Sequence, residues 1–459
     1  MATQFKDQGG AATMDPSPLM RWLTSQFMRR MAGEKQREKK RAAHEKSRKA
    51  AGKAHVVEYF HYVEDGYSHL AAQVLPALAE RYDIDLVCHL VRGPQGKNSA
   101  EPELLLQLSR YDAFHVAPEY GLAFPEHPQA PPSELVNLAE SILAAQDGAG
   151  FARLAGQVGE ALWAGDQVAL QALEGSHGSA TDAQRDAQLQ ASDARRHELK
   201  HYSGAMFYYG GEWYWGVDRL YHLEERLAGL GADCKPGEPM LVPRPAIAPG
   251  TLKDDGSLTL EVYPSLRSPY TAICFDKAVQ LARDTGVNLV VRPVLPMVMR
   301  GVPATREKGT YIFFDTQREA QTLGVPFGNV YDPIGDPVRR CYSIYPWACE
   351  QGKGIELLSS FLRAAFAEGV NTNNDRGLKQ VVEAAGLNWA EAMAHLGDSA
   401  WEEILEENRL CMYEAGIWGV PSFRLLDSQG QQLLALWGQD RLWLFAREIQ
   451  RQLQAREGG

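Results

Sequence analysis

An internal repeat constrains this chain more than any other feature: residues 57–124 recur 203 positions later without a gap. A long period of this kind defines the folding unit, so it has to be interpreted before any local pattern. The closing parts also agree, because residues 215–220 match residues 437–442 at a spacing of 222. We interpret the chain as a tandem duplication of a whole domain. Matching pairs include Tyr67 with Tyr270, Leu78 with Leu281, Leu86 with Leu289, Asp112 with Asp315 and Gly121 with Gly324.

Each copy begins with a predicted strand, helix and strand. Alternating β-rich residues and helical spacing indicate these elements at 55–62, 68–82 and 84–91, and again at 258–263, 271–285 and 287–294. Mostly helical sequence follows, through 101–199 and 311–415, and a hairpin and a helix close each copy. This order predicts an α/β chain of two tandem thioredoxin-like domains of the DsbA type, each with a helical insertion.

Composition shifts predict four segments. Residues 1–53 form a basic helical arm whose first fifteen residues are expected to be disordered, and residues 54–228 form the first domain. Residues 229–256 form a linker, because their prolines and glycines disfavour regular structure. Residues 257–457 form the second domain. The first domain is expected to pair with the second within the chain, as subunits pair in a homodimer.

The charge is unevenly distributed. Residues 29–53 carry eleven Lys and Arg against three Glu, a net +8, whereas the whole chain has −11. The remainder is therefore strongly acidic, which argues against nucleic-acid binding by the core. Within 17–31, apolar residues recur near one face of a helix, which is interpreted as a solvated arm packed on the body. Contact with a membrane surface or a nucleic acid is the alternative.

Cysteine use and hydropathy favour a cytoplasmic protein. No apolar run is long enough to span a membrane, and the first fifteen residues lack the order of a secretory signal. The six cysteines show no C-x-x-C and no metal-ligand spacing. We therefore expect neither disulfides nor a metal site.

The start of the second domain's first helix carries the main chemical signal. Redox members of this fold place C-x-x-C there, where the helix dipole favours a thiolate. This sequence instead has Ser268, Pro269, Tyr270 and Thr271. A disulfide oxidoreductase is therefore excluded at this position, but a serine hydroxyl could donate a hydrogen bond to a bound thiolate and lower its pKa.

Three ordered motifs resemble a known family. Ser-Pro-Tyr at 268–270, Gly-Val-Pro at 419–421 and Gly-Gln-Asp-Arg at 438–441 are similar to kappa-class glutathione transferases and 2-hydroxychromene-2-carboxylate isomerases. The resemblance implies that Ser268 contacts the glutathione sulfur and that Val420, before a cis Pro421, pairs with the cysteinyl backbone. It also implies that Gln439 and Asp440 bind the γ-glutamyl end.

A lysine completes the implied site. Lys308, in a Lys-Gly-x-Tyr segment, resembles the residue that reaches the glycyl carboxylate of glutathione. Each residue also has a structural interpretation: Ser268 as a helix N-cap, Asp440 as a first-turn acid, Pro421 as a hairpin residue and Lys308 as a solvated charge. Tyr270 and Cys274 are interpreted as core residues.

The first domain lacks the same chemistry. Asp65 stands where the second domain has Ser268, and no Val-Pro precedes its closing hairpin. A carboxylate opposite a thiolate would raise the thiol pKa, so this domain is interpreted as a degenerate partner. The sequence thus predicts a glutathione-dependent isomerase or transferase acting on an aromatic or otherwise electrophilic small molecule. The alternative is a non-catalytic thioredoxin-like scaffold that binds a partner through the same groove.

Overall fold

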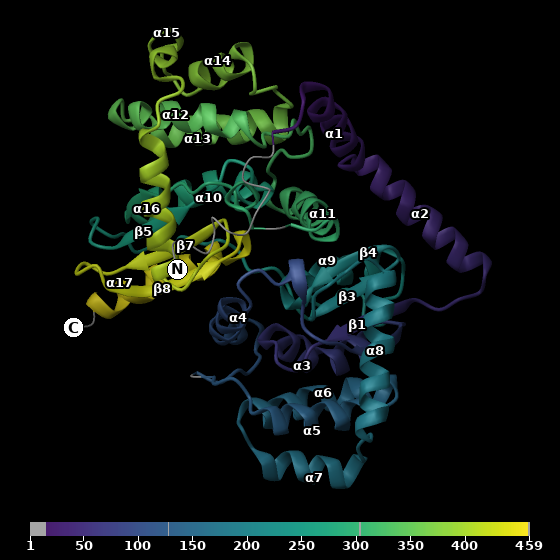
Figure 1. Ribbon diagram of the computed structural model, residues 1–459. Coiled ribbons are helices and arrows are strands. Elements are labelled where there is room, and N and C mark those ends of the chain that lie inside the picture. Colours follow the sequence, from purple (N-terminus) through teal and green to yellow (C-terminus); the bar gives the residue numbers. More distant parts are fainter. Residues whose placement is uncertain (1–14, 127, 303, 458–459) are drawn as a thin grey trace. The chain divides into compact units, whose positions relative to one another are not determined.

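The computed structural model describes residues 15–126, 128–302 and 304–457, which form two compact units. One unit runs from Glu38 to Pro245, and the other combines Ala246 onwards with the described residues up to Arg37. The boundary falls inside the expected linker. The first fifteen residues, which we expect to be disordered, lie outside the described residues except for Asp15. Figure 1 labels the elements of both units.

The two units contain sheets of the same topology. Their strand orders are β2-β1-β3-β4 and β6-β5-β7-β8, with the first pair parallel and the other two pairs antiparallel. The parallel registers also agree, because Val56 pairs with Asp85 and Thr259 with Asn288, each 203 residues apart from its counterpart. The strands are β1 (Val56–His61), β2 (Asp85–Leu90), β3 (Met206–Tyr209), β4 (Glu212–Trp215), β5 (Thr259–Tyr263), β6 (Asn288–Val291), β7 (Ser422–Leu426) and β8 (Gln432–Trp437).

In the first unit, helices close on the sheet as the sequence predicts. α3 follows β1 and packs on α6 and α9, whereas α6 and α8 pack against β2. The core is aromatic, with Tyr59, Phe60, Phe207 and Tyr214 fully buried. The helices are α3 (Gly66–Arg81), η1 (Gly96–Asn98), α4 (Pro102–Val116), η2 (Ala117–Tyr120), α5 (Ser133–Ala144), α6 (Gly148–Trp163), α7 (Gln167–His177), α8 (Asp182–Glu198) and α9 (Gly216–Gly229).

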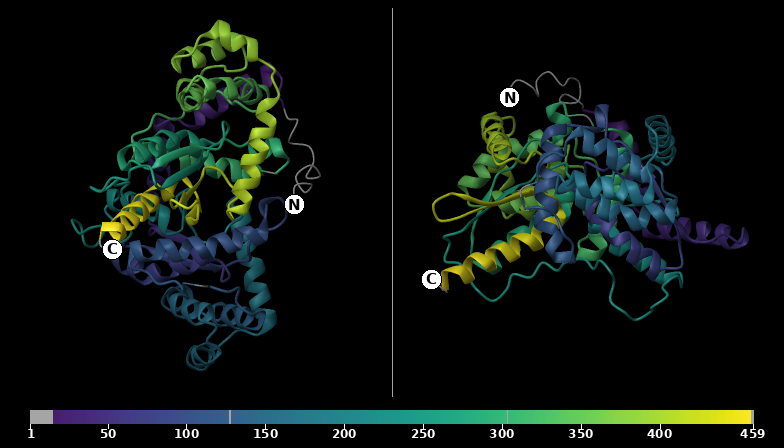
Figure 2. Two further views of the ribbon diagram at one scale, coloured as in Figure 1. Left: turned by 90° about the vertical axis from the view of Figure 1, so that its left-hand side faces the viewer. Right: turned by 90° about the horizontal axis from the view of Figure 1, so that it is seen from below.

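In the second unit, α10 packs against both the sheet and the helical insertion, so that all three share one core. Phe275 and Ala278 of α10 are buried in one cluster with Phe423 of β7 and Phe361 of α13. The helices are α10 (Pro269–Thr285), η3 (Met297–Arg300), α11 (Arg306–Leu323), α12 (Asp336–Glu350), α13 (Gly354–Arg363), η4 (Ala364–Glu368), α14 (Asp375–Ala384), α15 (Trp389–Ala392), η5 (Met393–His395), α16 (Ala400–Glu414), η6 (Gln439–Arg441) and α17 (Leu442–Glu457). Figures 1 and 2 show α16 running from the α12–α15 group towards the β7–β8 hairpin.

The basic arm consists of α1 (Pro18–Met31) and α2 (Glu34–Ala50). α1 packs on the second unit, where Arg21 is almost fully buried and donates to the carbonyl oxygen of Asp332 at 2.9 Å. Arg41 of α2 belongs to the first unit, where its Nε lies 2.7 Å from Glu212 Oε1. Each helix of the arm is therefore held by polar contacts within its own unit. No helix in the described part of the chain is long and apolar enough to cross a bilayer.

Candidate functional site

Ser268 stands at the N-terminus of α10, directly after the loop that follows β5. Its hydroxyl accepts a hydrogen bond from Thr271 N at 3.2 Å, so the serine caps the helix. The same Oγ donates to the carbonyl oxygen of Val420 at 3.4 Å. Both Ser268 and Val420 are half-buried, so a ligand can reach them from solvent. The hydroxyl proton is thus held near the backbone of the segment that precedes β7.

That segment contains the predicted cis bond. The peptide between Val420 and Pro421 is cis, which confirms the prediction. Pro421 O accepts from Gly438 N at 3.0 Å, which ties the segment to the turn after β8. Gly419 lies against the indole of Trp437, where a side chain would have no room. Ser268, the Val420–Pro421 segment and the 438–440 turn therefore form one connected group.

Gln439 and Asp440 lie in η6, which packs against α10. Gln439 is buried and its amide donates to Glu319 Oε2 at 2.7 Å, so this side chain is committed to α11. The Asp440 carboxylate lies close enough to Cys274 to add to the raised pKa of that thiol, which burial mainly causes. Asp440 is therefore positioned on the α10 side of the turn, whereas Gln439 points towards α11.

Lys308 lies in the first turn of α11, after the N-cap Thr305. Burial lowers the pKa of its ammonium group. Within the described chain Lys308 makes no ion pair, and no hydrogen bond joins its side chain to the other candidate residues. A half-buried cation without a counter-ion favours an anionic ligand, because pairing would offset its desolvation.

The helix start contains no thiol. Cys274 is buried, and burial raises its pKa, which makes it a poor nucleophile. All six cysteines are free, and no cluster of three metal-ligating side chains occurs among the residues that the structure describes. Dithiol exchange cannot run from this helix start, so any thiol chemistry there needs a thiol supplied by a ligand.

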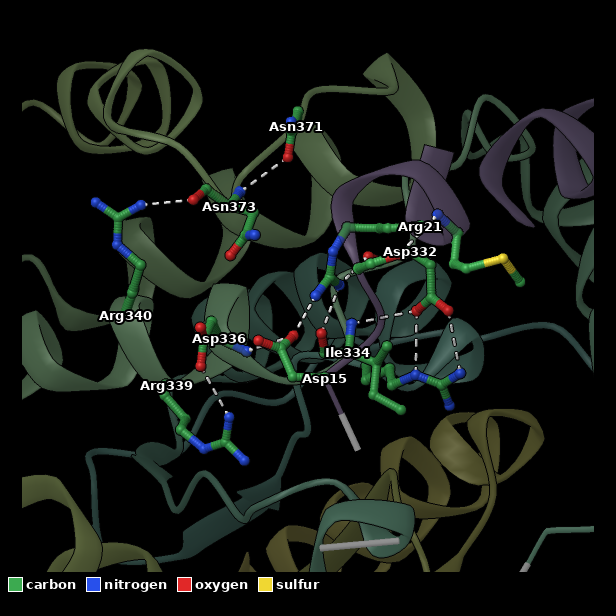
Figure 3. A network of polar contacts seen from close by, with 12 residues as sticks. Asp15, Arg21, Asp332, Ile334, Asp336, Arg339, Arg340, Asn371 and Asn373 are labelled. Atoms are coloured by element: carbon green, nitrogen blue, oxygen red, sulfur yellow. Dashed lines mark hydrogen bonds and ion pairs between the residues drawn. The ribbon is translucent and has the colours of Figure 1, made fainter. Parts of the chain in front are cut away.

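Arg267 and Asp332 are site neighbours that the sequence reasoning missed. Arg267 directly precedes Ser268, and its Nε lies 3.1 Å from Asp332 Oδ1. Asp332 N in turn donates to Ser25 Oγ of α1 at 3.1 Å. The arm is thus linked to the residue beside Ser268, as Figure 3 shows for Asp332 and Arg21. The partners lie 65 and 307 positions apart, and no sequence pattern pairs residues at such distances.

In the first unit, Asp65 occupies the N-cap of α3. Its carboxylate accepts from Ser68 N at 3.1 Å and Ser68 Oγ at 2.9 Å. Burial nevertheless raises the pKa of Asp65 to about 6. An acid held inward by its own helix cannot activate a ligand thiol, because its charged form would repel a thiolate.

The segment before β3 also differs from its counterpart in the second unit. Ala205 precedes β3 at the place that Pro421 holds before β7, and it has a positive φ of 55°. A Cβ added to the neighbouring Gly204 would lie 2.6 Å from Tyr62 Cβ. This backbone therefore approaches Tyr62 too closely for a side chain such as that of Val420. These described residues of the first unit therefore hold no counterpart of the Ser268 hydroxyl or of the cis bond between Val420 and Pro421, although Asp218 corresponds to Asp440.

Comparison with known proteins identifies the second unit. Residues 259–450 match the family model described as a DSBA-like thioredoxin domain. The second unit is a DSBA-like thioredoxin domain. The first unit has the same strand order, so the chain contains two thioredoxin-like domains in tandem, each with a helical insertion. The comparison with curated proteins gives no significant match.

The solved structures that match this chain are each about as long as one of its domains. A 2-hydroxychromene-2-carboxylate isomerase structure is 21% identical, with a TM-score of 0.36, and the match covers 44% of this chain and 98% of that one. The cytosolic disulfide reductase DsbM from Pseudomonas aeruginosa is 22% identical, with a TM-score of 0.34, and the match covers 42% and 99%. Such matches concern the fold.

Proposed function

We propose that the second domain binds glutathione and acts as a glutathione-dependent isomerase or transferase. The observation that carries this proposal is the position of the Ser268 hydroxyl, which caps α10 and lies 3.4 Å from the carbonyl oxygen of Val420. An extended thiol peptide that pairs with the Val420 backbone would bring its sulfur towards this hydroxyl. Donation from Ser268 would then favour the thiolate over the thiol.

Lys308 supports the same ligand from a second direction. The glycyl carboxylate of glutathione would supply the counter-ion that this half-buried ammonium lacks within the described residues. Asp440, on the α10 side of its turn, would accept from the γ-glutamyl amine. In this proposal Gln439 acts indirectly, because its amide already holds Glu319.

The thiolate would attack an aromatic or otherwise electrophilic small molecule. In a transfer, the sulfur's electron pair forms the sulfur–carbon bond, the bond from that carbon to the leaving group breaks and its electron pair stays on the leaving group, and the thiol proton passes to solvent or to the leaving group. In an isomerisation, the same bond forms and later breaks, so glutathione is regenerated. Cytoplasmic glutathione would serve either reaction, and the six free cysteines suit such a reducing compartment.

The alternative is a non-catalytic scaffold that binds a protein partner through the same groove. The close approach of Gly204 to Tyr62, which leaves no room there for a side chain such as that of Val420, favours a structural role for that half of the chain. Pairing of the two domains within one chain stays a prediction.

Calorimetric titration separates these proposals. The full chain should bind glutathione with a measurable heat, whereas a tripeptide with alanine in place of cysteine should bind more weakly. Ophthalmate, in which a methyl group replaces the thiol, tests the sulfur contact alone. Equal affinity for all three ligands, or no binding of glutathione, would contradict the enzyme proposal.

A further inference from the structure

Helix α1 packs on the rest of the second unit through polar side chains and, near its C-terminal end, through Met28 and Met31. Arg21 is 1% exposed and donates to the carbonyl oxygens of Asp332 and Ile334, as Figure 3 shows. Ser25 is fully buried, donates to Arg21 O at 2.6 Å and accepts from Asp332 N at 3.1 Å. Arg29 donates to Val330 O at 3.0 Å and to Gly369 O at 2.8 Å.

The opposite face of α1 is apolar and open to solvent. Leu19, Met20, Leu23 and Phe27 recur along it at helical spacing and lie about opposite Arg21 and Ser25 on the helix. Around Arg21 and Ser25, the usual polarity of a surface helix is therefore reversed. The exposed fractions on this face are 65% for Leu19, 54% for Met20, 46% for Leu23 and 57% for Phe27, and Trp22, at 47%, lies at its edge.

The polar contacts fix this orientation. Turning α1 to bury its apolar face would remove the carbonyl partners of Arg21, and a buried guanidinium without partners is costly. The apolar face is therefore held outward by the same bonds that attach the helix. A contiguous apolar patch held in this way marks an interaction surface.

Basic residues accompany the patch. Arg30 is exposed, and its place on the helical wheel falls between Leu19 and Leu23. The charge of residues 29–53 is +8, in a chain whose total is −11. Lys35, which follows α1 within the same unit, is also exposed. An amphipathic helix with aromatic and leucine residues on one side and a basic continuation fits the interface of an anionic bilayer.

The size of the patch argues against a second copy of this chain. Four side chains about half exposed amount to roughly 400 Å², whereas a stable dimer needs about 800 Å² from each partner. Two copies joined at α1 would also bring two strongly basic segments together. We propose that the apolar face of α1 docks on anionic phospholipid membranes, an activity separate from the proposed glutathione site.

Vesicle sedimentation with the full chain tests this inference. Sucrose-loaded vesicles of phosphatidylcholine with about one-third phosphatidylserine should carry the protein into the pellet, and pure phosphatidylcholine should carry much less. The double variant Leu23→Gln/Phe27→Gln changes only the outer face and should lower partitioning on the order of tenfold or more. Added salt should weaken binding of the natural chain, because screening reduces attraction to the lipid charge.

The control is Val168→Gln/Met393→Gln, which removes two exposed apolar side chains elsewhere, at 76% and 45% exposure. This variant should sediment like the natural chain. The melting curves of both double variants should match the melting curve of the natural chain. Two results overturn the proposal: no preference for anionic vesicles, or equal loss in both double variants. A dimer that Leu23→Gln/Phe27→Gln converts to a monomer, without vesicle binding, would assign the face to a second copy.

Discussion

The Tyr270 hydroxyl donates a 2.7 Å hydrogen bond to the fully buried carboxylate of Asp315. The equivalent pair 203 residues earlier, Tyr67 and Asp112, makes the same bond at 2.7 Å. The bond joins α3 to α4 in the first domain and α10 to α11 in the second. Tyr270, which the sequence suggested as a core residue, therefore anchors the helix that Ser268 caps.

Tyr270→Phe should destabilise the second domain. The variant keeps the ring but removes the hydroxyl donor, while the ion pair of Asp315 with Arg318, whose Nη2 lies 3.0 Å away, stays in place. Loss of a hydrogen bond to a charged group costs about 1.5–3 kcal/mol. Urea unfolding should show this loss, and Tyr67→Phe should give a similar loss through Asp112. A free energy of unfolding unchanged in both variants would refute this role.

The fold could be predicted because the repeat fixes it twice. A register such as Val56 with Asp85 follows from the apolar pattern of each strand, and the second copy repeats it at Thr259 and Asn288. The orientation of α1 could not be predicted, because helical periodicity marks an apolar face without showing which face packs. That depends on carbonyl groups more than 300 positions from Arg21.

Only part of the site could be predicted, because a motif names residues without giving the direction of their side chains. Ser268 and Val420 belong to motifs, and the structure brings them together. Gln439 belongs to a motif too, yet its amide holds Glu319, a partner that no motif contains. Motifs record which residues recur in order, whereas the direction of a buried side chain depends on the packing around it.

Ser268→Ala should remove thiol activation while keeping the fold. Loss of the N-cap costs about 1 kcal/mol, and loss of donation to a thiolate raises the pKa of bound glutathione by about one to two units. The ultraviolet band of the thiolate, followed across pH at saturating ligand, measures this change. Ser268→Thr keeps the hydroxyl and is the matched control. Superimposable titrations of the natural chain and Ser268→Ala would exclude the catalytic role.

Asp65→Asn should make the first domain more stable at neutral pH. Burial raises the pKa of Asp65 to about 6 from 3.8. The stabilisation that protonated Asp65 gives the folded state is therefore fully present below pH 3.8 and is lost as pH rises through about 6. The neutral amide removes this loss, worth up to about 3 kcal/mol at pH 7, and its oxygen can still cap α3. Urea midpoints at pH 4 and pH 7 should differ less in the variant. An equal pH dependence in both proteins would show that Asp65 is not the group involved.

Lys308→Gln should weaken glutathione binding through the glycyl end alone. Burial lowers the pKa of the Lys308 ammonium group, and a bound carboxylate would raise that pKa again. Affinity of the natural chain should therefore fall as pH rises through the pKa of free Lys308, and the variant should lack that fall. Its affinity at neutral pH should drop roughly five- to tenfold, in the range of a partly buried ion pair.

Calorimetry with γ-glutamylcysteine, which has no glycine, isolates the contact, because Lys308→Gln should not change its binding. The exposed Lys379, paired with Glu383 at 3.7 Å, provides the control variant Lys379→Gln, which should leave both affinities unchanged. If Lys308→Gln weakens both ligands equally, the lysine acts through general charge or folding, and the glycyl contact is wrong.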